Sequence, residues 1–276
     1  MASPGLLELA TAEQANAKRI LYAWIPCCHA LTASFTLAAL FAPLGVAYPL
    51  ALAILTLQVV AWSLRSNAAA KHRRAEEARR RALLMDALGE DAERLDVANI
   101  RLAFSKRACR DAKALDRTGY WSDTSPRGPQ RLLGTLQESA FWSHALYDTA
   151  ATAATRTLIA VVSTLFIVAL IGLAAFSGST ALAVARVIVV SLSALIALDV
   201  LGQALAWRTA ARQAEAVDRR LEVIDGTTIE PMLAIVADYA IATASAPPIP
   251  DRVYESKSGE LDELWREHRS QPRRAT

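Results

Sequence analysis

Two long apolar blocks dominate the hydropathy pattern of this chain. The first runs from Ile20 to Leu64 without a Lys, Arg, Asp or Glu. The second starts at Thr157, stays free of these residues to Ala185 and continues as an apolar stretch to Trp207. A helix needs about 20 apolar residues to cross a bilayer, so each block has room for two spans and a short turn. The pattern predicts four membrane-spanning helices, at Ile20–Ala42, Gly45–Leu64, Thr157–Phe176 and Ala183–Trp207.

Basic residues gather at one end of each predicted span. They include Lys18, Arg19, Arg65, Lys71, Arg73, Arg74, Arg156, Arg208 and Arg212. The turns at the opposite ends, Ala42–Gly45 and Ser177–Thr180, carry no charge. Aromatic residues typical of the membrane interface lie at the basic ends, namely Tyr22, Trp24, Trp62 and Trp207. Since basic loops stay in the cytoplasm, we expect a multi-pass membrane protein with both termini and the middle region cytoplasmic.

The hydropathy pattern divides the chain into five regions. They are a cytoplasmic lead-in (1–19), a transmembrane hairpin (20–64), a cytoplasmic helical insert (65–155), a second transmembrane hairpin (156–207) and a C-terminal cytoplasmic helical region (208–276). In the insert, leucines at helical spacing predict one helix over Asn67–Asp116, or two hinged near Gly89. A Pro- and Gly-rich loop, Arg117–Pro129, should lead into a helix over Gln130–Thr155 that continues into the third span.

The C-terminal region shows the same helical character. A helix should continue from the fourth span to Ile224, where Gly226 ends it and Thr227–Thr228 cap the next helix. That helix should reach Ser245, and a short final helix is predicted over Glu260–Arg269, with a disordered tail after it. No β pattern is present, so we predict an all-α integral membrane protein.

Composition excludes most enzymatic chemistry. The chain is 53% hydrophobic with a net charge of +3. Its cysteines, Cys27, Cys28 and Cys109, form no CxxC pair, and its histidines do not stand at metal-ligand spacing. No P-loop, GxGxxG or GxSxG motif occurs. We therefore predict no enzyme, no catalytic residue, no cofactor and no metal. The acidic pair Glu76–Glu77 should face solvent, and the basic run Lys71–Arg81 should contact anionic lipid head groups.

Two charged residues lie inside the predicted fourth span, where charge is costly. Arg186 lies near the outer end and has room to extend its side chain to the interface. Asp199 lies deeper, and Gln203 follows one helical turn later. We predict that Asp199, Gln203 and Arg186 face a pore or the interior of the helix bundle.

Aromatic and basic residues concentrate in the loop of the insert. Tyr120, Trp121, Arg127 and Arg131 combine ring faces with guanidinium groups, which suits stacked bases and phosphates. The same residues are also suited to a small core between the loop and the neighbouring helices. Both interpretations stay open at the level of sequence.

Four segments together resemble a known family. They are Ala17–Ala23 (AKRILYA), Tyr120–Ser122 followed by Pro129–Leu133, Gln137–Leu146 (QESAFWSHAL) and Ala246–Trp265 (APPIPDRVYESKSGELDELW). With two spans on either side of a cytoplasmic insert, the chain resembles the bacterial four-transmembrane effectors associated with cyclic-oligonucleotide antiphage signalling (CBASS).

The resemblance implies a function. A partner nucleotidyltransferase would make a cyclic di- or trinucleotide, which would bind the cytoplasmic part of the effector. The membrane part would then rearrange or form a homo-oligomer and permeabilise the inner membrane, with no role for DNA or RNA. Two other interpretations remain: a channel or transporter, and a membrane-anchored scaffold whose helical insert binds a protein partner.

Overall fold

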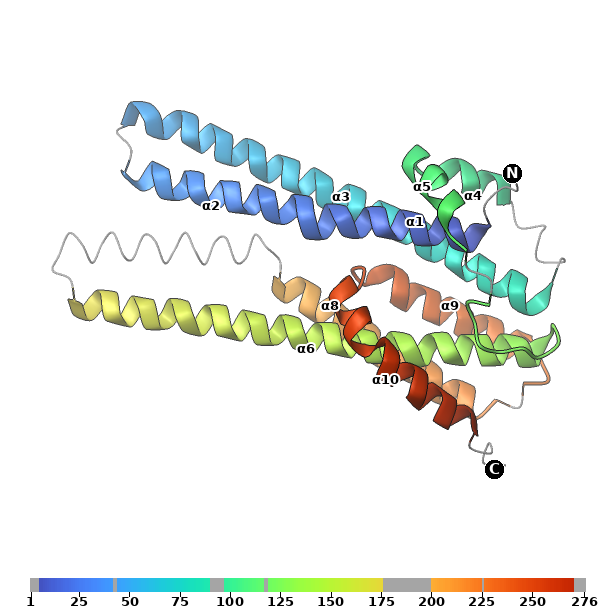
Figure 1. Ribbon diagram of the computed structural model, residues 1–276. Helices are drawn as coiled ribbons and strands as arrows, with labels where there is room; N and C mark the ends of the chain where they lie inside the picture. The colour runs from blue at the N-terminus through green and yellow to red at the C-terminus, as the bar shows by residue number, and fades with distance from the viewer. Residues whose placement is uncertain are drawn as a thin grey trace. The chain divides into compact units, whose positions relative to one another are not determined.

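The computed structural model describes residues 5–41, 44–89, 97–116, 119–175, 200–224 and 226–270. Every regular element in these ranges is a helix, and none of their residues belongs to a strand. The predicted all-α fold is therefore confirmed for this part of the chain. The elements in order are α1 (Leu6–Arg19), the π-helix η1 (Ile20–Trp24), α2 (Ile25–Phe41), α3 (Leu44–Leu88), α4 (Val97–Ala103), α5 (Lys106–Asp111), the 3₁₀-helix η3 (Ala112–Ala114), α6 (Pro129–Ala175), α8 (Val200–Glu222), α9 (Glu230–Ser245) and α10 (Asp251–Ser270) (Figure 1).

The chain forms two compact units. Unit 1 combines Met1–Lys18, Ala69–Ala150 and Ala206–Thr276, and unit 2 combines Arg19–Ala68 and Ala151–Leu205. α3, α6 and α8 each continue without interruption past a unit boundary and contribute several residues to both units, and α1 crosses a boundary at its last residue, Arg19. α3 and α6 confirm the predicted helical continuity from 45–64 into the residues that follow, and from 130–155 into the residues after Thr157.

Unit 1 has a conventional apolar core. Its larger cluster joins α3, α6, α8 and α9 through Leu83, Ala87, Leu132, Leu133, Leu136, Ala140, Val217, Leu221, Met232, Ile235, Val236 and Tyr239. A second cluster joins α1, α3 and α5 through Leu9, Ala10, Ala12, Ala75, Ala78, Phe104, Ala108 and Ala112. Gly89, directly after α3, and Gly226, between α8 and α9, have the positive φ that favours glycine, 87° and 72°.

Unit 2 presents a different surface. Its large apolar side chains are mostly exposed, including Trp24, Leu31, Val46, Tyr48, Leu52, Leu55, Val59, Val60, Trp62, Ile159, Val162, Phe166, Ile167, Leu201 and Leu205. A small cluster of Leu21, Ile25 and Ala68 joins the start of α2 to α3, and the two helices run side by side (Figure 1). Among the described residues, one helix, Tyr48–Leu88, is long and apolar enough to cross a membrane, and 6% of its apolar window is buried.

The transition from α1 to α2 contains a π-helical turn. The backbone N–H of Ile25 donates to the carbonyl of Ile20, five residues earlier. Pro26 follows directly, and in a regular α-helix its ring would crowd the carbonyl four residues before it. A wider turn relieves that contact, which accounts for the π segment directly before Pro26.

Several predicted boundaries were wrong. α10 begins at Asp251, well before the predicted Glu260. Gly259 lies inside this helix, where a side chain would meet open space, and an exposed glycine costs a helix only about 1 kcal/mol. α9 begins at Glu230 with Ile229 as its N-cap, so Thr227–Thr228 do not cap it.

Candidate functional site

The predicted ligand-binding loop lies in unit 1, directly before α6. Trp121 is half-buried against the larger apolar cluster, and its Nε1 donates to Ser139 Oγ at 3.2 Å. Tyr120 is exposed, with its ring set edge-on to Trp121 at a centroid distance of 5.1 Å. The indole of Trp121 therefore anchors the loop to α6, while the Tyr120 ring stays open to solvent.

The two arginines of the predicted ligand site, Arg127 in the loop and Arg131 in the first turn of α6, also differ in exposure and partners. The Arg131 Nε and Nη2 atoms donate to the two carboxylate oxygens of Asp86 at 2.9 Å each, and Nη1 donates to the carbonyl of Ser125 at 2.9 Å. Arg127 is exposed beside Gly89. The Arg131 guanidinium already ties α3 to α6, whereas the Arg127 and Tyr120 side chains are exposed. Nucleotide contact by Tyr120, Trp121, Arg127 and Arg131 stays a prediction.

Ser122 joins this loop to α6 and α10. Its backbone N–H and its Oγ both donate to Glu138 Oε2, at 2.9 and 2.8 Å. The same Oγ accepts from Trp265 Nε1 at 3.0 Å, and Arg269 Nη1 donates to the Ser122 carbonyl at 2.9 Å. The final helix is thereby fixed to the loop by polar contacts as well as by packing.

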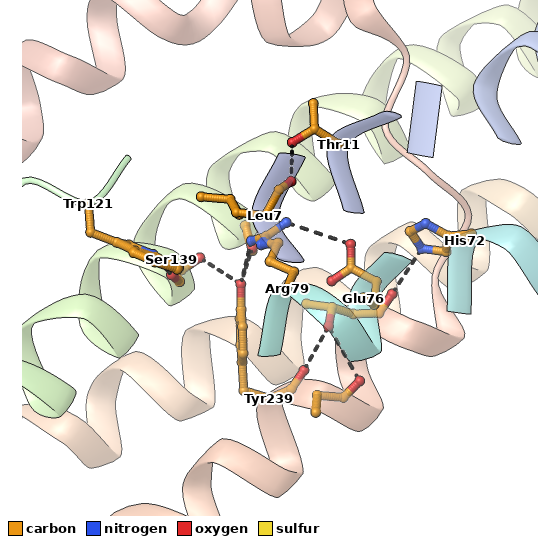
Figure 2. Close-up of polar contacts among 11 residues, drawn as sticks. Leu7, Thr11, His72, Glu76, Arg79, Trp121, Ser139 and Tyr239 are labelled. Carbon is orange, nitrogen blue, oxygen red and sulfur yellow. Dashed lines mark hydrogen bonds and ion pairs between the residues drawn. The ribbon is translucent and has the colours of Figure 1, made fainter. Parts of the chain in front are cut away.

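Figure 2 shows a polar network inside unit 1, built on Arg79 of α3. Arg79 lies 3.6 Å from the Glu76 carboxylate and donates to the Tyr239 hydroxyl at 3.2 Å. The Tyr239 hydroxyl donates to the Ser139 carbonyl at 3.0 Å and lies 2.7 Å from Ser143 Oγ. Burial raises the pKa of Tyr239, which keeps its hydroxyl protonated as a donor. The network links α3, α6 and α9.

A second polar group lies nearer the N-terminus of α3, around Lys71 and His72. Glu13 of α1 is fully buried and accepts from Lys71 Nζ at 3.0 Å and from Ser105 Oγ at 2.6 Å. His72 is also buried, with Nε2 3.2 Å from the Thr243 carbonyl. These contacts join α1, α3, α9 and the start of α5.

Three surface predictions for this part of α3 were wrong. Glu76 is buried, with 6% of its side chain exposed, so it does not face solvent. Lys71 and Arg79 have 13% and 23% of their side chains exposed and bind protein partners, so they do not contact lipid head groups. The charges looked like a solvated face because the partners that bury Lys71 and Arg79, Glu13 and Tyr239, lie far along the chain.

A third cluster of titratable groups surrounds Asp218 of α8. His144 and Gln137 approach from α6, His268 from α10, and Glu222 lies one turn further along α8. His268 stacks on the rings of Trp265 and Phe141. Within the described structure, Asp218 Oδ1 is buried without a hydrogen-bond partner. Burial, followed by repulsion from Glu222, raises the pKa of the Asp218 carboxyl to about 6.

We expect Asp218→Asn to stabilise the protein at neutral pH. The native pKa lies above the ordinary value of 3.8, so folding favours the protonated acid, and this advantage disappears as pH rises through 6. The ionised carboxylate then costs roughly 1–2 kcal/mol once the shift is discounted for partial solvent screening. Thermal midpoints of the detergent-solubilised chain should therefore differ more at pH 8 than at pH 4.

Asp262→Asn is the matched control, because Asp262 is exposed on α10. It should change the midpoint little at either pH. A stabilisation by Asp218→Asn of the same size at both pH values would show that the Asp218 charge is not its cause.

The predicted pore residues lie mostly outside the described residues. Arg186 and Asp199 both fall in the undescribed range 176–199. Gln203 is half-buried on α8 and belongs to unit 2. Trp207, expected at the membrane interface, is instead buried in unit 1, and its Nε1 donates to the Pro247 carbonyl at 2.9 Å.

The structure also reveals a basic groove that sequence reasoning did not single out. Arg73, Arg74 and Arg81 line it from α3, opposite Asn99 and Ile100 of α4. The signal in the sequence was the basic run itself, but only the structure separates these arginines from Lys71 and Arg79. Among the residues with described positions, no cluster of three or more His, Cys, Asp or Glu is arranged to hold a metal ion.

The polar groups described above do not form a single catalytic constellation. The buried ones join helices of unit 1 to one another, whereas the groove and the Tyr120–Arg127 surface are open to ligands. Comparisons with family models, with curated proteins and with solved structures find no match to this chain.

Proposed function

We propose that this chain is a four-span effector of the bacterial inner membrane. In this proposal a cyclic di- or trinucleotide, made by a partner nucleotidyltransferase, binds its cytoplasmic side. The membrane part then rearranges or forms a homo-oligomer and permeabilises the membrane. Unit 1 would be the cytoplasmic part, and unit 2, which contains nearly all of both predicted hairpins, would be the membrane part. Asp199, Gln203 and Arg186 would line the pore or the bundle interior.

The exposed apolar surface of unit 2 supports the membrane location. The helix Tyr48–Leu88 is long and apolar, and the 6% burial of its apolar window differs from that of a core helix in a soluble protein. Exposed residues on α2 and α6, such as Leu31 and Phe166, extend the same property to other helices. A surface of this extent needs an apolar environment, which the bilayer provides.

The continuity of three helices carries the proposed gating. α3, α6 and α8 each supply residues to both units without a break. A ligand that binds one arrangement of these helices in unit 1 more tightly than another shifts the population toward that arrangement. Because the same helices continue into unit 2, that shift changes unit 2 as well.

Dye release from liposomes tests this proposal. Purified full-length protein is reconstituted in liposomes loaded with a self-quenching dye and exposed to cyclic and linear di- and trinucleotides. We expect one cyclic nucleotide to trigger release that its linear form does not, and Asp199→Ala to reduce that release severalfold.

Correct insertion is checked in the same preparation. On a background lacking Cys27, Cys28 and Cys109, a cysteine at Ser179 and one at Ser256 of α10 should react with an impermeant maleimide from opposite sides of the membrane. Inserted protein that releases no dye with any nucleotide would overturn the gated-effector proposal. Constitutive solute flux would favour a channel or transporter, and capture of a protein without leakage would favour a scaffold.

A further inference from the structure

An open groove of about 580 Å³ lies between α3 and α4. It is lined by Ala70, Arg73, Arg74, Glu77, Arg81, Asn99, Ile100 and Ala103. All of these residues belong to unit 1, so the groove is a feature of one compact part of the chain. Small-molecule sites typically have volumes of about 300–1,000 Å³, so a molecule of nucleotide size fits.

The groove carries an excess of positive charge. Three of its lining residues are arginines, and Glu77 is the one carboxylate among them. Arg81 Nε donates to Glu77 Oε1 at 2.8 Å, and Arg80 donates to the other carboxylate oxygen. Burial alone would raise the pKa of Glu77, but these two arginines hold it below its usual value. The carboxylate is therefore ionised and already occupied by Arg80 and Arg81.

Arg73 and Arg74 are the groove arginines available to a ligand. Both side chains are exposed, and no carboxylate in the described part of the chain forms an ion pair with either. They are adjacent in α3, one turn before Glu77. Two guanidinium groups in this arrangement can each form paired hydrogen bonds to phosphate oxygens.

The remaining walls suit the body of a ligand rather than its charge. Ala70 lines the α3 wall, and Ile100 and Ala103 line the α4 wall. Their side chains are small or aliphatic and form no polar contact. Asn99 adds one amide, which both donates and accepts hydrogen bonds. A ligand with an anionic backbone and flat or apolar groups matches both parts of the lining.

We propose that the groove between α3 and α4 binds a phosphodiester of nucleotide size, with Arg73 and Arg74 as its phosphate ligands. The inference rests on the function proposed above in taking a nucleotide as the natural source of that group. In this inference the phosphate contacts lie on α3 and not at the predicted site around Arg131, because the Arg131 guanidinium is already hydrogen-bonded to Asp86. A phospholipid head group has the same phosphodiester chemistry, so the test separates the two sources.

Direct binding tests the site. The full chain in nanodiscs of phosphatidylcholine is titrated with cyclic and linear dinucleotides of adenine and guanine, and binding is measured by microscale thermophoresis. At least one dinucleotide should bind, and the double variant Arg73→Gln/Arg74→Gln should weaken its affinity about tenfold or more, as expected for the loss of charge-assisted hydrogen bonds. Affinity should also fall as salt is raised.

Arg252→Gln/Arg266→Gln is the matched control, since both residues are exposed on α10 and the change in net charge is identical. It should bind as the wild type does. If both double variants lose the same dinucleotide affinity, the effect comes from overall charge and the site is overturned. Unchanged affinity in Arg73→Gln/Arg74→Gln would also overturn the site. Unaltered melting midpoints exclude misfolding as the cause.

The lipid arm uses nanodiscs containing phosphatidylglycerol. If the groove holds a lipid head group, dinucleotides should not bind. Arg73→Gln/Arg74→Gln (the groove variant), but not Arg252→Gln/Arg266→Gln, should then lose affinity for phosphatidylglycerol vesicles. That result would overturn the nucleotide as the ligand. Nucleotide-triggered leakage that persists in the groove variant would overturn this site and leave the proposed function standing. If nucleotide binding depends on Arg73 and Arg74 but no nucleotide triggers leakage, the binding site stands and the proposed function is overturned.

Discussion

Replacing Arg79 with methionine should lower the thermal midpoint of the detergent-solubilised chain by about 6–12 °C. Methionine fills the volume of the aliphatic part of arginine but leaves the buried Glu76 carboxylate without its ion-pair partner. Breaking a buried pair by removing one member costs about 3–5 kcal/mol. We use the lower end of this range, about 3 kcal/mol, because 23% of the Arg79 side chain is exposed. In a domain of this size, each kcal/mol of lost stability lowers the thermal midpoint by about 2–4 °C.

Two further variants isolate the cause of that loss. Arg79→Met combined with Glu76→Leu removes both charges and should recover most of the midpoint, because no unpaired buried charge remains. Arg74→Met changes an exposed arginine on the same helix and should have little effect. If Arg79→Met and Arg74→Met melt alike, Arg79 does not stabilise unit 1 through its buried partners.

The second large effect is expected at Trp265 on α10. Its ring is 6% exposed, lies 5.4 Å from the Phe141 ring and donates through Nε1 to Ser122. Truncation of a buried tryptophan to alanine costs about 3–5 kcal/mol. Trp265 and Leu261 are the buried residues that α10 contributes to unit 1, so we expect Trp265→Ala to release this helix from unit 1 rather than unfold the whole unit.

Limited trypsin digestion followed by intact mass measurement detects that release. The variant should be cut rapidly within α10, which carries Arg252, Lys257, Arg266 and Arg269, while the rest of unit 1 stays resistant. Leu264→Ala is the control, because Leu264 is adjacent and 43% exposed. Digestion of Trp265→Ala at the wild-type rate would mean that α10 does not depend on this ring.

The sequence predicted the long helices well because the governing signals are local. No glycine or proline interrupts the chain between Pro49 and Gly89 or between Gly134 and Gly172, so α3 and α6 continue where the hydrophobic pattern changes to a charged one. Gly89 marked the end of α3 for the same reason. Local signals misled at Gly259, where contacts of Trp265 with α6 and the loop outweigh the low helix propensity of one glycine.

The site was much harder to predict, because its contacts join residues far apart in the chain. Arg79 and Glu76 look like part of an exposed charged face until Tyr239 is brought against them, and the partner of Lys71 lies in α1. The loop residues were correctly seen as aromatic and basic, but the sequence could not show that Asp86 occupies Arg131. Likewise, the groove exists only because α4 lies beside α3.

The adjacent pair Trp121 and Ser122 has a consequence for how this protein can change in evolution. The Trp121 side chain is fixed to α6, and Ser122 is bound to α10. Ser122 also donates to Glu138 of α6, so inserting or deleting one residue between this pair and α6 would displace both residues from their partners. The length of the loop between Trp121 and α6 is therefore constrained. Ser122, Glu138 and Trp265 should accordingly be inherited as a set.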